Sequence, residues 1–399
     1  MYKKRSTLLK YYFCFIALLC TSAQSSASPE FEFSGFGRIV AGYLSTDNAE
    51  LDNYENSISF DEQSLIAIQT DILFNEKFSA SVQLLGHSSE DRDSGVEWAY
   101  LTYSPSDKLD IRIGRQRTLF YNYSDVIDVG FAYAWITPPR GVYSNVLFPQ
   151  YEGLNIKYMD LVGDFLLSGE LFWGAYNNDQ TALGSSFSNN INDYRGFVFN
   201  LSTGPLSVRA SYADANINVS VDDLEPLRDI LIGVGFASSA ELLQINDLGR
   251  FFQIDVKYEE FDWFIEIEAN RLTSKAPLVA DRNGLAITAG YHYHSFLFYS
   301  SFSSLNSDEP TITSGIPVGI DPQLDLLDFG FQATVDSVIF NSGETYTVGL
   351  RYDLNQNISL KTSITHVEGA INQDSFFINT DSSFNNRAQL YQLALEWVF

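Results

Sequence analysis

The stretch YQLALEWVF, residues 391–399, places a large apolar side chain at every second position. Those side chains are Tyr391, Leu393, Leu395, Trp397 and Phe399, and smaller or polar residues lie between them. Successive side chains of a β-strand point to opposite faces of the sheet, so a period of two predicts a strand with one apolar face. The chain therefore closes on a strand, and the question is what its apolar face contacts.

The opposite terminus indicates where the protein goes. Residues 1–27 have the pattern of a cleaved secretory signal peptide: basic residues, then an apolar run at 11–20, then the small residues Ser25, Ser26 and Ala27. The apolar run is too short to cross a bilayer. Both cysteines, Cys14 and Cys20, lie in this segment. The mature part, residues 28–399, is thus expected to fold without disulfides.

Charge and composition exclude several classes of protein. The chain has a net charge of −26, and 15% of its residues are aromatic. So acidic a protein is not expected to bind nucleic acid. The mature part has no apolar run long enough for a membrane helix. Alternating apolar and polar residues with near-neutral mean hydropathy favour a membrane β-barrel, with lipid outside and water inside.

Alternating segments recur about sixteen times in the mature chain. They lie at 31–44, 64–74, 78–84, 96–104, 109–113, 154–158, 165–173, 197–201, 206–212, 252–258, 263–267, 285–293, 296–302, 346–352, 358–364 and 391–399. We predict an all-β fold, a transmembrane antiparallel up-and-down β-barrel of about 16 strands. The first and last strands are expected to pair, because closure satisfies backbone groups that an open edge would leave unpaired in lipid.

The connections between these segments alternate strictly between short and long. Short connections are expected near 75–77, 104–108, 159–163, 203–205, 259–261, 294–295 and 355–357. Long ones, rich in Asp, Asn and Ser, are expected near 45–61, 88–95, 118–151, 177–194, 214–249, 272–283, 304–343 and 368–387. This order is typical of outer-membrane barrels with periplasmic turns and outer loops, which places both termini in the periplasm.

With a signal peptide, about sixteen amphipathic strands and a terminal Phe399, the chain resembles the Gram-negative general porins. The most family-like stretch is IRIGRQRTLFYNYSDVIDVGFAYAWITPPRGVY, residues 111–143, although the PEFGG signature of enterobacterial porins is absent. The resemblance implies that residues 118–151 fold into the lumen as a constriction loop. It also implies a homotrimer, passive diffusion of small hydrophilic solutes and ions, and recognition of the terminal strand by the barrel-assembly machinery.

Selectivity in such a channel depends on the charges that line its narrowest part. Alternation directs Arg38, Asp110, Arg112, Arg209, Arg351 and Lys361 toward the lumen and adds Gln116, while it leaves open which way Arg115 and Arg117 face. Asp125, Asp128 and Arg140 belong to the candidate constriction loop. The resemblance implies a basic ladder on the wall opposite the loop acids. The alternative is that these charges pair with one another and with water.

The sequence is compatible with more than one role for the loop aromatics and for the barrel. Aromatic residues of the third long loop, from Phe120 to Tyr143, either form a path for sugars or pack the loop against the wall. Three functions are compatible with the sequence: a general porin, a sugar- or anion-specific porin, and a structural or adhesive barrel without transport. Residues 214–249 are expected to hold one or two short helices. Outer-loop acids could share cations with lipopolysaccharide. We expect no enzyme activity, no cofactor and no metal site.

Overall fold

The computed structural model describes residues 28–89, 92, 94–144, 148–182, 185–308, 311–336, 338, 340–370 and 375–399. The expected signal peptide, residues 1–27, lies outside this described part.

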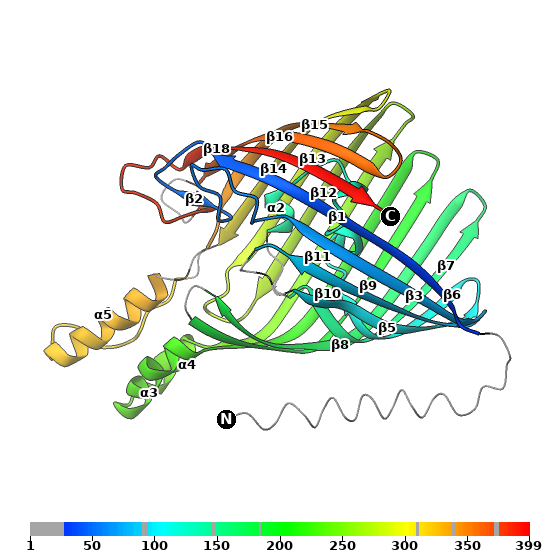
Figure 1. Cartoon of the computed structure of the whole chain (residues 1–399). Helices are drawn as coiled ribbons and strands as arrows, with labels where there is room; N and C mark the ends of the chain where they lie inside the picture. Colours follow the sequence, from blue (N-terminus) through cyan, green and yellow to red (C-terminus); the bar gives the residue numbers. More distant parts are fainter. Residues whose placement is uncertain are drawn as a thin grey trace.

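Sixteen strands form one closed antiparallel barrel in which each strand pairs with its neighbours along the chain (Figure 1). They are β1 (Glu30–Leu44), β3 (Leu65–Asn75), β4 (Phe78–His87), β5 (Gly95–Ser106), β6 (Leu109–Arg117), β7 (Gln150–Val162), β8 (Phe165–Ala182), β9 (Ser185–Thr203), β10 (Leu206–Val221), β11 (Ile245–Glu259), β12 (Trp263–Ser274), β13 (Asp281–Tyr293), β14 (Phe296–Asp308), β15 (Gly343–Asp353), β16 (Ile358–Gly369) and β18 (Arg387–Val398). Two short strands, β2 (Glu50–Leu51) and β17 (Phe377–Ile378), pair separately. The predicted up-and-down barrel is confirmed.

The barrel closes where β1 pairs with β18. Gly35 and Phe399 exchange two backbone hydrogen bonds of 2.9 Å, so the seam is paired up to the final residue. One step further, Gly37 lies opposite Trp397, and a Cβ at Gly37 would lie only 2.4 Å from the indole ring. The aromatic ring therefore covers a glycine on the outer face of the seam.

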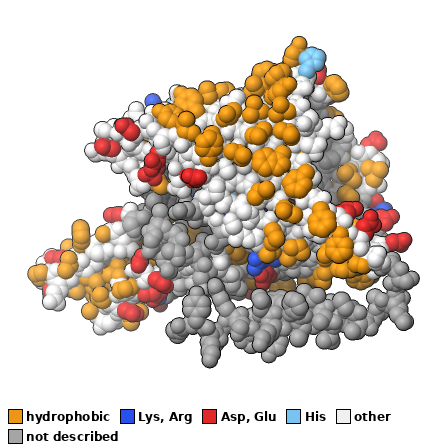
Figure 2. Space-filling view, in the orientation of Figure 1, with side chains coloured by type: hydrophobic (Ala, Val, Ile, Leu, Met, Phe, Trp, Pro, Cys, Tyr) orange, Lys and Arg blue, Asp and Glu red, His pale blue; other side chains and the backbone are white. Residues whose placement is uncertain are grey.

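The two faces of the wall differ in polarity as the period of two predicts. On β12, Ile265 and Ile267 are exposed on the outside, whereas Glu266 and Glu268 between them are buried inside. Figure 2 shows apolar side chains spread over the visible outer wall. An outward apolar band around a polar interior is the pattern of a barrel whose outer face contacts lipid. Among the described residues, no helix is long and apolar enough to cross a membrane.

Two of the long connections differ from the sequence prediction. Strands β8 and β9 stay paired as far as Ala182 and Ser185, so most of the expected loop at 177–194 is a β-hairpin. Likewise β10 and β11 pair up to Val219 and Ile245, which shortens the irregular part of 214–249. Both extensions have polar sequences, because strands that continue beyond the lipid need no apolar face.

Apart from the connection between β6 and β7, two of the long connections hold helices. They are the 3₁₀ turn η3 (Asp222–Leu224), α3 (Glu225–Gly233) and α4 (Ala237–Leu242) between β10 and β11, and α5 (Pro322–Asp336) between β14 and β15. Leu231 of α3 and Phe331 of α5 are fully buried in one shared apolar cluster. In Figure 1 the three helices lie together beyond the strand ends. The chain thus carries a small helical unit outside the barrel.

Candidate pore constriction

The described residues of the connection between β6 and β7, 118–144 and 148–149, lie inside the barrel, and we call them the inner loop. It holds the 3₁₀ turns η1 (Ser124–Val126) and η2 (Gly130–Ala132) and the short helix α2 (Arg140–Tyr143). It contacts inward side chains of strands on distant parts of the ring, including Arg209 on β10 and Lys361 on β16. A segment that reaches both strands must cross the interior. The stretch expected as a constriction loop, 118–151, includes this connection.

Lys361 holds the middle of the inner loop. Its Nζ donates to the carbonyl oxygens of Gly130 at 2.7 Å, Tyr133 at 2.7 Å and Trp135 at 2.9 Å. The same ammonium lies 2.8 Å from a carboxylate oxygen of Glu396 on β18. An irregular buried segment leaves its carbonyl groups without regular partners, and the three donors of a lysine can satisfy several of them at once. Lys361 therefore acts as an anchor of the inner loop.

Three wall arginines bind the inner loop in a similar way. Arg209 donates to the carbonyls of Leu119 at 2.8 Å and Phe120 at 3.3 Å. Arg351 donates to the Phe131 carbonyl at 2.7 Å, and its guanidinium carbon lies 4.4 Å from the centre of that ring. Arg38 donates to the Gln63 carbonyl at 2.8 Å and to the Tyr133 hydroxyl at 3.3 Å.

These contacts correct the expected basic ladder. Arg38, Arg209, Arg351 and Lys361 do face inward, but each donates at least one hydrogen bond to the inner loop. Among the described residues, Arg112 is the one of the five predicted wall bases that makes no hydrogen bond to this loop. The alternative, in which these charges pair with one another and with water, is represented by the Arg351–Asp353 and Lys361–Glu396 ion pairs.

Asp128 of the inner loop belongs to a buried ion-pair network. Its carboxylate accepts hydrogen bonds from Arg92 at 2.6 and 2.8 Å and from Arg117, and Arg117 also pairs with Glu97. Burial alone would raise the pKa of Asp128, but the two guanidinium groups hold it well below its usual range. The charge of Asp128 is thus balanced by Arg92 and Arg117, and its role is structural.

The end of the inner loop packs closely on the wall. A Cβ at Gly141 in α2 would lie 2.5 Å from backbone atoms of Ser304 on β14, so only glycine allows this approach. The preceding Arg140 is buried and pairs with Asp52 of the connection between β1 and β3. Arg140 therefore ties the inner loop to the connection between β1 and β3 and is buried in that contact.

The aromatic residues of the inner loop are packing residues. The ring of Phe120 packs edge-on against Phe148 and Tyr194, with centroids 5.3 and 5.6 Å apart. Tyr133 and Trp135 are buried in a second cluster with wall residues of β12 and β14. The interpretation that these rings pack the loop against the wall is confirmed for the buried rings. Because they are buried, these rings do not form a continuous exposed aromatic path.

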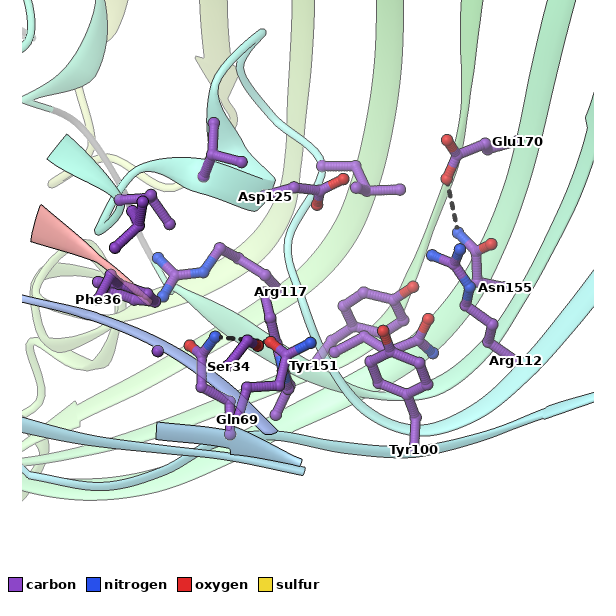
Figure 3. A pocket seen from close by; sticks show the side chains of 18 of the residues that line it. Ser34, Phe36, Gln69, Tyr100, Arg112, Arg117, Asp125, Tyr151, Asn155 and Glu170 are labelled. Carbon is purple, nitrogen blue, oxygen red and sulfur yellow. Dashed lines mark hydrogen bonds between the residues drawn. The ribbon is translucent and has the colours of Figure 1, made fainter. Parts of the chain in front are cut away.

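A cavity of about 490 Å³ separates the inner loop from the opposite wall. Its lining comes from the loop residues Leu119, Asp125, Val126 and Val129, from residues of β1 and β3–β8, and from Val398 and Phe399 at the end of the last strand. Figure 3 shows Arg112, Asn155 and Glu170 on the wall, with Asp125 extending from the loop. Gln116 lines the same cavity and donates to the Gly153 carbonyl at 3.4 Å.

The charges around this cavity are only partly paired. Arg112 has one long ion pair, 3.9 Å from Asp110, and lies 5.6 Å from the centre of the Tyr100 ring. Asp125 is exposed to the cavity, and no ion pair with another described residue satisfies it. The charge of Glu170 is compensated by Lys157, whose Nζ lies 3.0 Å from a carboxylate oxygen of Glu170. Arg112 and Asp125 are thus the cavity's most available base and acid.

The two remaining candidates, Arg115 and Asp110, lie on opposite faces of the wall. Arg115 lies on the outer face with Ile113, which is 58% exposed, and pairs with Glu152 at 2.8 Å. It is therefore not a pore-lining residue. Asp110 does face inward and accepts a hydrogen bond of 2.6 Å from the Ser104 hydroxyl.

Sequence alternation missed Glu97 and Arg92. The register between β4 and β5 shifts at Gln83 and Leu84, and this β-bulge turns Glu97 inward beside Trp98. Arg92 reaches the same network from the connection before β5. A bulge leaves no clear mark on the apolar pattern, so neither residue could be placed from it.

Comparisons with known proteins agree with this architecture. The family model of Gram-negative porins matches residues 15–395. No curated protein matches the chain by sequence. Among solved structures, the outer membrane channel DcaP of Acinetobacter baumannii is similar with a TM-score of 0.57 at 11% identity, covering 94% of this chain and 99% of that chain.

Two further solved structures have the same fold. The anion-selective porin from Comamonas acidovorans aligns with a TM-score of 0.55 at 11% identity, covering 93% of this chain and all of the other. A trimer form of OmpT, an outer membrane protein of Vibrio cholerae, aligns with a TM-score of 0.55 at 10% identity, covering 94% and 100% of the two chains. With the family match and the closed barrel together, the chain belongs to the Gram-negative porins and is an outer-membrane channel for passive diffusion.

Proposed function

We propose that small hydrophilic solutes and ions cross this barrel through the cavity between the inner loop and the β3–β8 wall. The observation that carries the proposal is the position of Arg112 on the wall and Asp125 on the loop, both facing the cavity without a close partner. Passage needs no cofactor and no chemical step. The residues proposed to set selectivity are thus Arg112 and Asp125, with Asp110, Gln116 and the Lys157–Glu170 pair contributing polarity.

The expected selectivity follows from the charges near the path. Unpaired charges on both sides of a narrow, water-filled passage create a transverse field that orients dipolar solutes. One base facing one acid leaves the cavity close to neutral, so discrimination by charge is weak there. The acidic chain, with a net charge of −26, adds a mild preference for cations at the entrances.

Reversal potentials across planar bilayers in asymmetric KCl test this proposal. Arg112→Gln should shift the selectivity toward cations, and Asp125→Asn should shift it toward anions. Arg115→Gln is the matched control, because Arg115 lies on the same strand but on the outer face. If Arg112→Gln and Arg115→Gln give the same reversal potential as the natural protein, the proposed path is wrong.

Anion specificity is the second candidate, and the availability of the Arg112 guanidinium favours it. A preference for chloride in the natural protein, abolished by Arg112→Gln, would support anion specificity over general diffusion. A folded barrel without stepwise conductance would instead point to a structural or adhesive role.

We also propose a homotrimer, as in the trimer form of Vibrio cholerae OmpT. The termini would lie in the periplasm, with the long connections and the helical unit outside, beside lipopolysaccharide. In this orientation the terminal strand, from Tyr391 to Phe399, is the segment offered to the barrel-assembly machinery. Cross-linking of the detergent-purified protein tests the trimer, and protease access in intact cells tests the orientation.

A further inference from the structure

Three acidic side chains meet on the wall beneath the inner loop. Asp255 of β11 and Glu266 and Glu268 of β12 are all buried, and each offers a carboxylate oxygen within 4.8 Å of the others. Neighbouring carboxylates at this separation repel one another strongly when water is excluded. Such a group requires protons or a bound cation to remain together.

The hydrogen bonds around two of these acids favour their charged forms. Tyr123 donates to Glu266 at 2.9 Å, and Tyr143 donates to Glu268 at 2.6 Å. Asn122 donates to both glutamates at 3.1 Å, through its backbone N–H and its side-chain amide. Donors that converge on a carboxylate stabilise the anion and not the neutral acid.

Asp255 supplies an independent observation. Its side chain is only 2% exposed, its Oδ2 has no hydrogen-bond partner among the described residues, and one oxygen of its carboxylate belongs to the cluster. A buried carboxylate oxygen without a donor is costly, and it requires an explanation such as an ion.

The nearby bases are engaged elsewhere. Arg209 lies directly across from Asp255 in the sheet register, but its hydrogen bonds go to Gln253 and to the inner-loop carbonyls. Lys257 pairs with Glu259 at 2.6 Å. Within the described part of the chain, no ion pair joins a lysine or an arginine to any of the three acids.

We propose that Asp255, Glu266 and Glu268 bind a divalent cation of the calcium type, which fastens the inner loop to the wall. Ca²⁺ takes oxygen ligands at about 2.3–2.6 Å, so oxygens on opposite sides of the ion lie about 5 Å apart. The cluster fits within that limit, and bidentate carboxylates and water can complete the coordination. Asn122, Tyr123 and Tyr143 then bind the ligands from the loop side, so the ion links both elements.

Calcium binding to the full-length folded protein in detergent, after removal of divalent ions by a chelator, tests the site. Equilibrium dialysis with radioactive Ca²⁺ should show tight binding that Asp255→Asn and Glu266→Gln each remove. Asp71→Asn is the matched control, because Asp71 also faces inward but lies on β3 and has donors from Gln69 and Ser81. Heat-dependent gel migration verifies that each variant is folded.

A second measurement separates this site from the many acids of the outer loops. Tb³⁺ bound at the cluster should show luminescence excited through Tyr123 and Tyr143, lost in Asp255→Asn and kept in Asp71→Asn. Equal binding by all variants, or no tight binding by the natural protein, would overturn the proposal and leave a cluster that shares protons. Neither readout depends on conductance, so the result is independent of the proposed solute path.

Discussion

Lys361 and Glu396 form an ion pair of 2.8 Å in which the two side chains are 0% and 1% exposed. Lys361 lies on β16 and Glu396 on β18, and the same ammonium binds three carbonyls of the inner loop. A buried charge of this kind is tolerated because its partners replace water. The pair therefore connects the barrel seam with the inner loop.

Lys361→Met should destabilise the folded protein by about 3–5 kcal/mol, because it leaves the Glu396 carboxylate buried without its counter-charge. The inner loop loses three hydrogen bonds as well, so single-channel current should become noisier. Urea unfolding and bilayer recordings measure the two effects. Adding Glu396→Gln should restore part of the stability but leave the single-channel current noisy. A Lys361→Met channel with no more current noise than the natural protein would contradict the anchoring role.

The Asp128 network should make the inner loop resistant to mild acid. Because the pKa of Asp128 is held well below its usual range by Arg117 and Arg92 against the effect of burial, its stabilisation is complete above about pH 4 and is lost as the pH falls further. Asp128→Asn should therefore lower the unfolding midpoint equally at pH 8 and pH 6, and less at pH 3. Asp125→Asn, on the same loop but without an ion pair, is the control and should change little.

Trp397→Ala should weaken the barrel seam by about 1 kcal/mol, because the ring that covers Gly37 on the outer face is lost. We expect a smaller folded fraction after refolding into lipid vesicles, followed by heat-dependent gel migration. Leu393→Ala is the control, since Leu393 points to the same face but lies opposite Ala41. Equal folding of both variants would remove the special role of the glycine–tryptophan pair.

The helical unit should unfold independently of the barrel. Phe331 of α5 is fully buried in it, so Phe331→Ala should cost about 3–5 kcal/mol of local stability. The connection between β14 and β15 should become sensitive to protease, while the barrel keeps its melting temperature. Phe329→Ala, on the same helix but 70% exposed, should leave protease resistance unchanged.

The sequence pattern predicts the strands well where one of their faces contacts lipid. Strands such as β12 alternate strictly because one face contacts lipid and the other water, and the predicted pairing of the first and last strands is confirmed. Where strands extend beyond the lipid, alternation of apolar and polar residues is not required, so the polar hairpin of β8 and β9 has the sequence pattern of a loop. Helix α5 was missed although Leu327, Phe331 and Val335 repeat at helical spacing, because the surrounding Asp residues suggested an irregular segment.

The site was less predictable than the fold. Alternation correctly directed Arg38, Arg209, Arg351 and Lys361 inward, but it contains no information on how the inner loop would lie against them. Lys361, Arg209 and Arg351 donate to carbonyls of the inner loop, in contacts between segments up to 231 residues apart along the chain. Arg38 donates to the Tyr133 hydroxyl of the same loop. Only the cavity left beside the loop distinguishes Arg112 and Asp125 from the other charges.

The off-centre position of the cavity has a practical consequence for engineering. The cavity lies on the β3–β8 side of the inner loop, where Gln69, Gln83, Tyr100 and Asn155 contribute side chains to the free margin of the aperture. Larger or smaller residues at those four places should retune the size cut-off, while closure of the cylinder is left untouched.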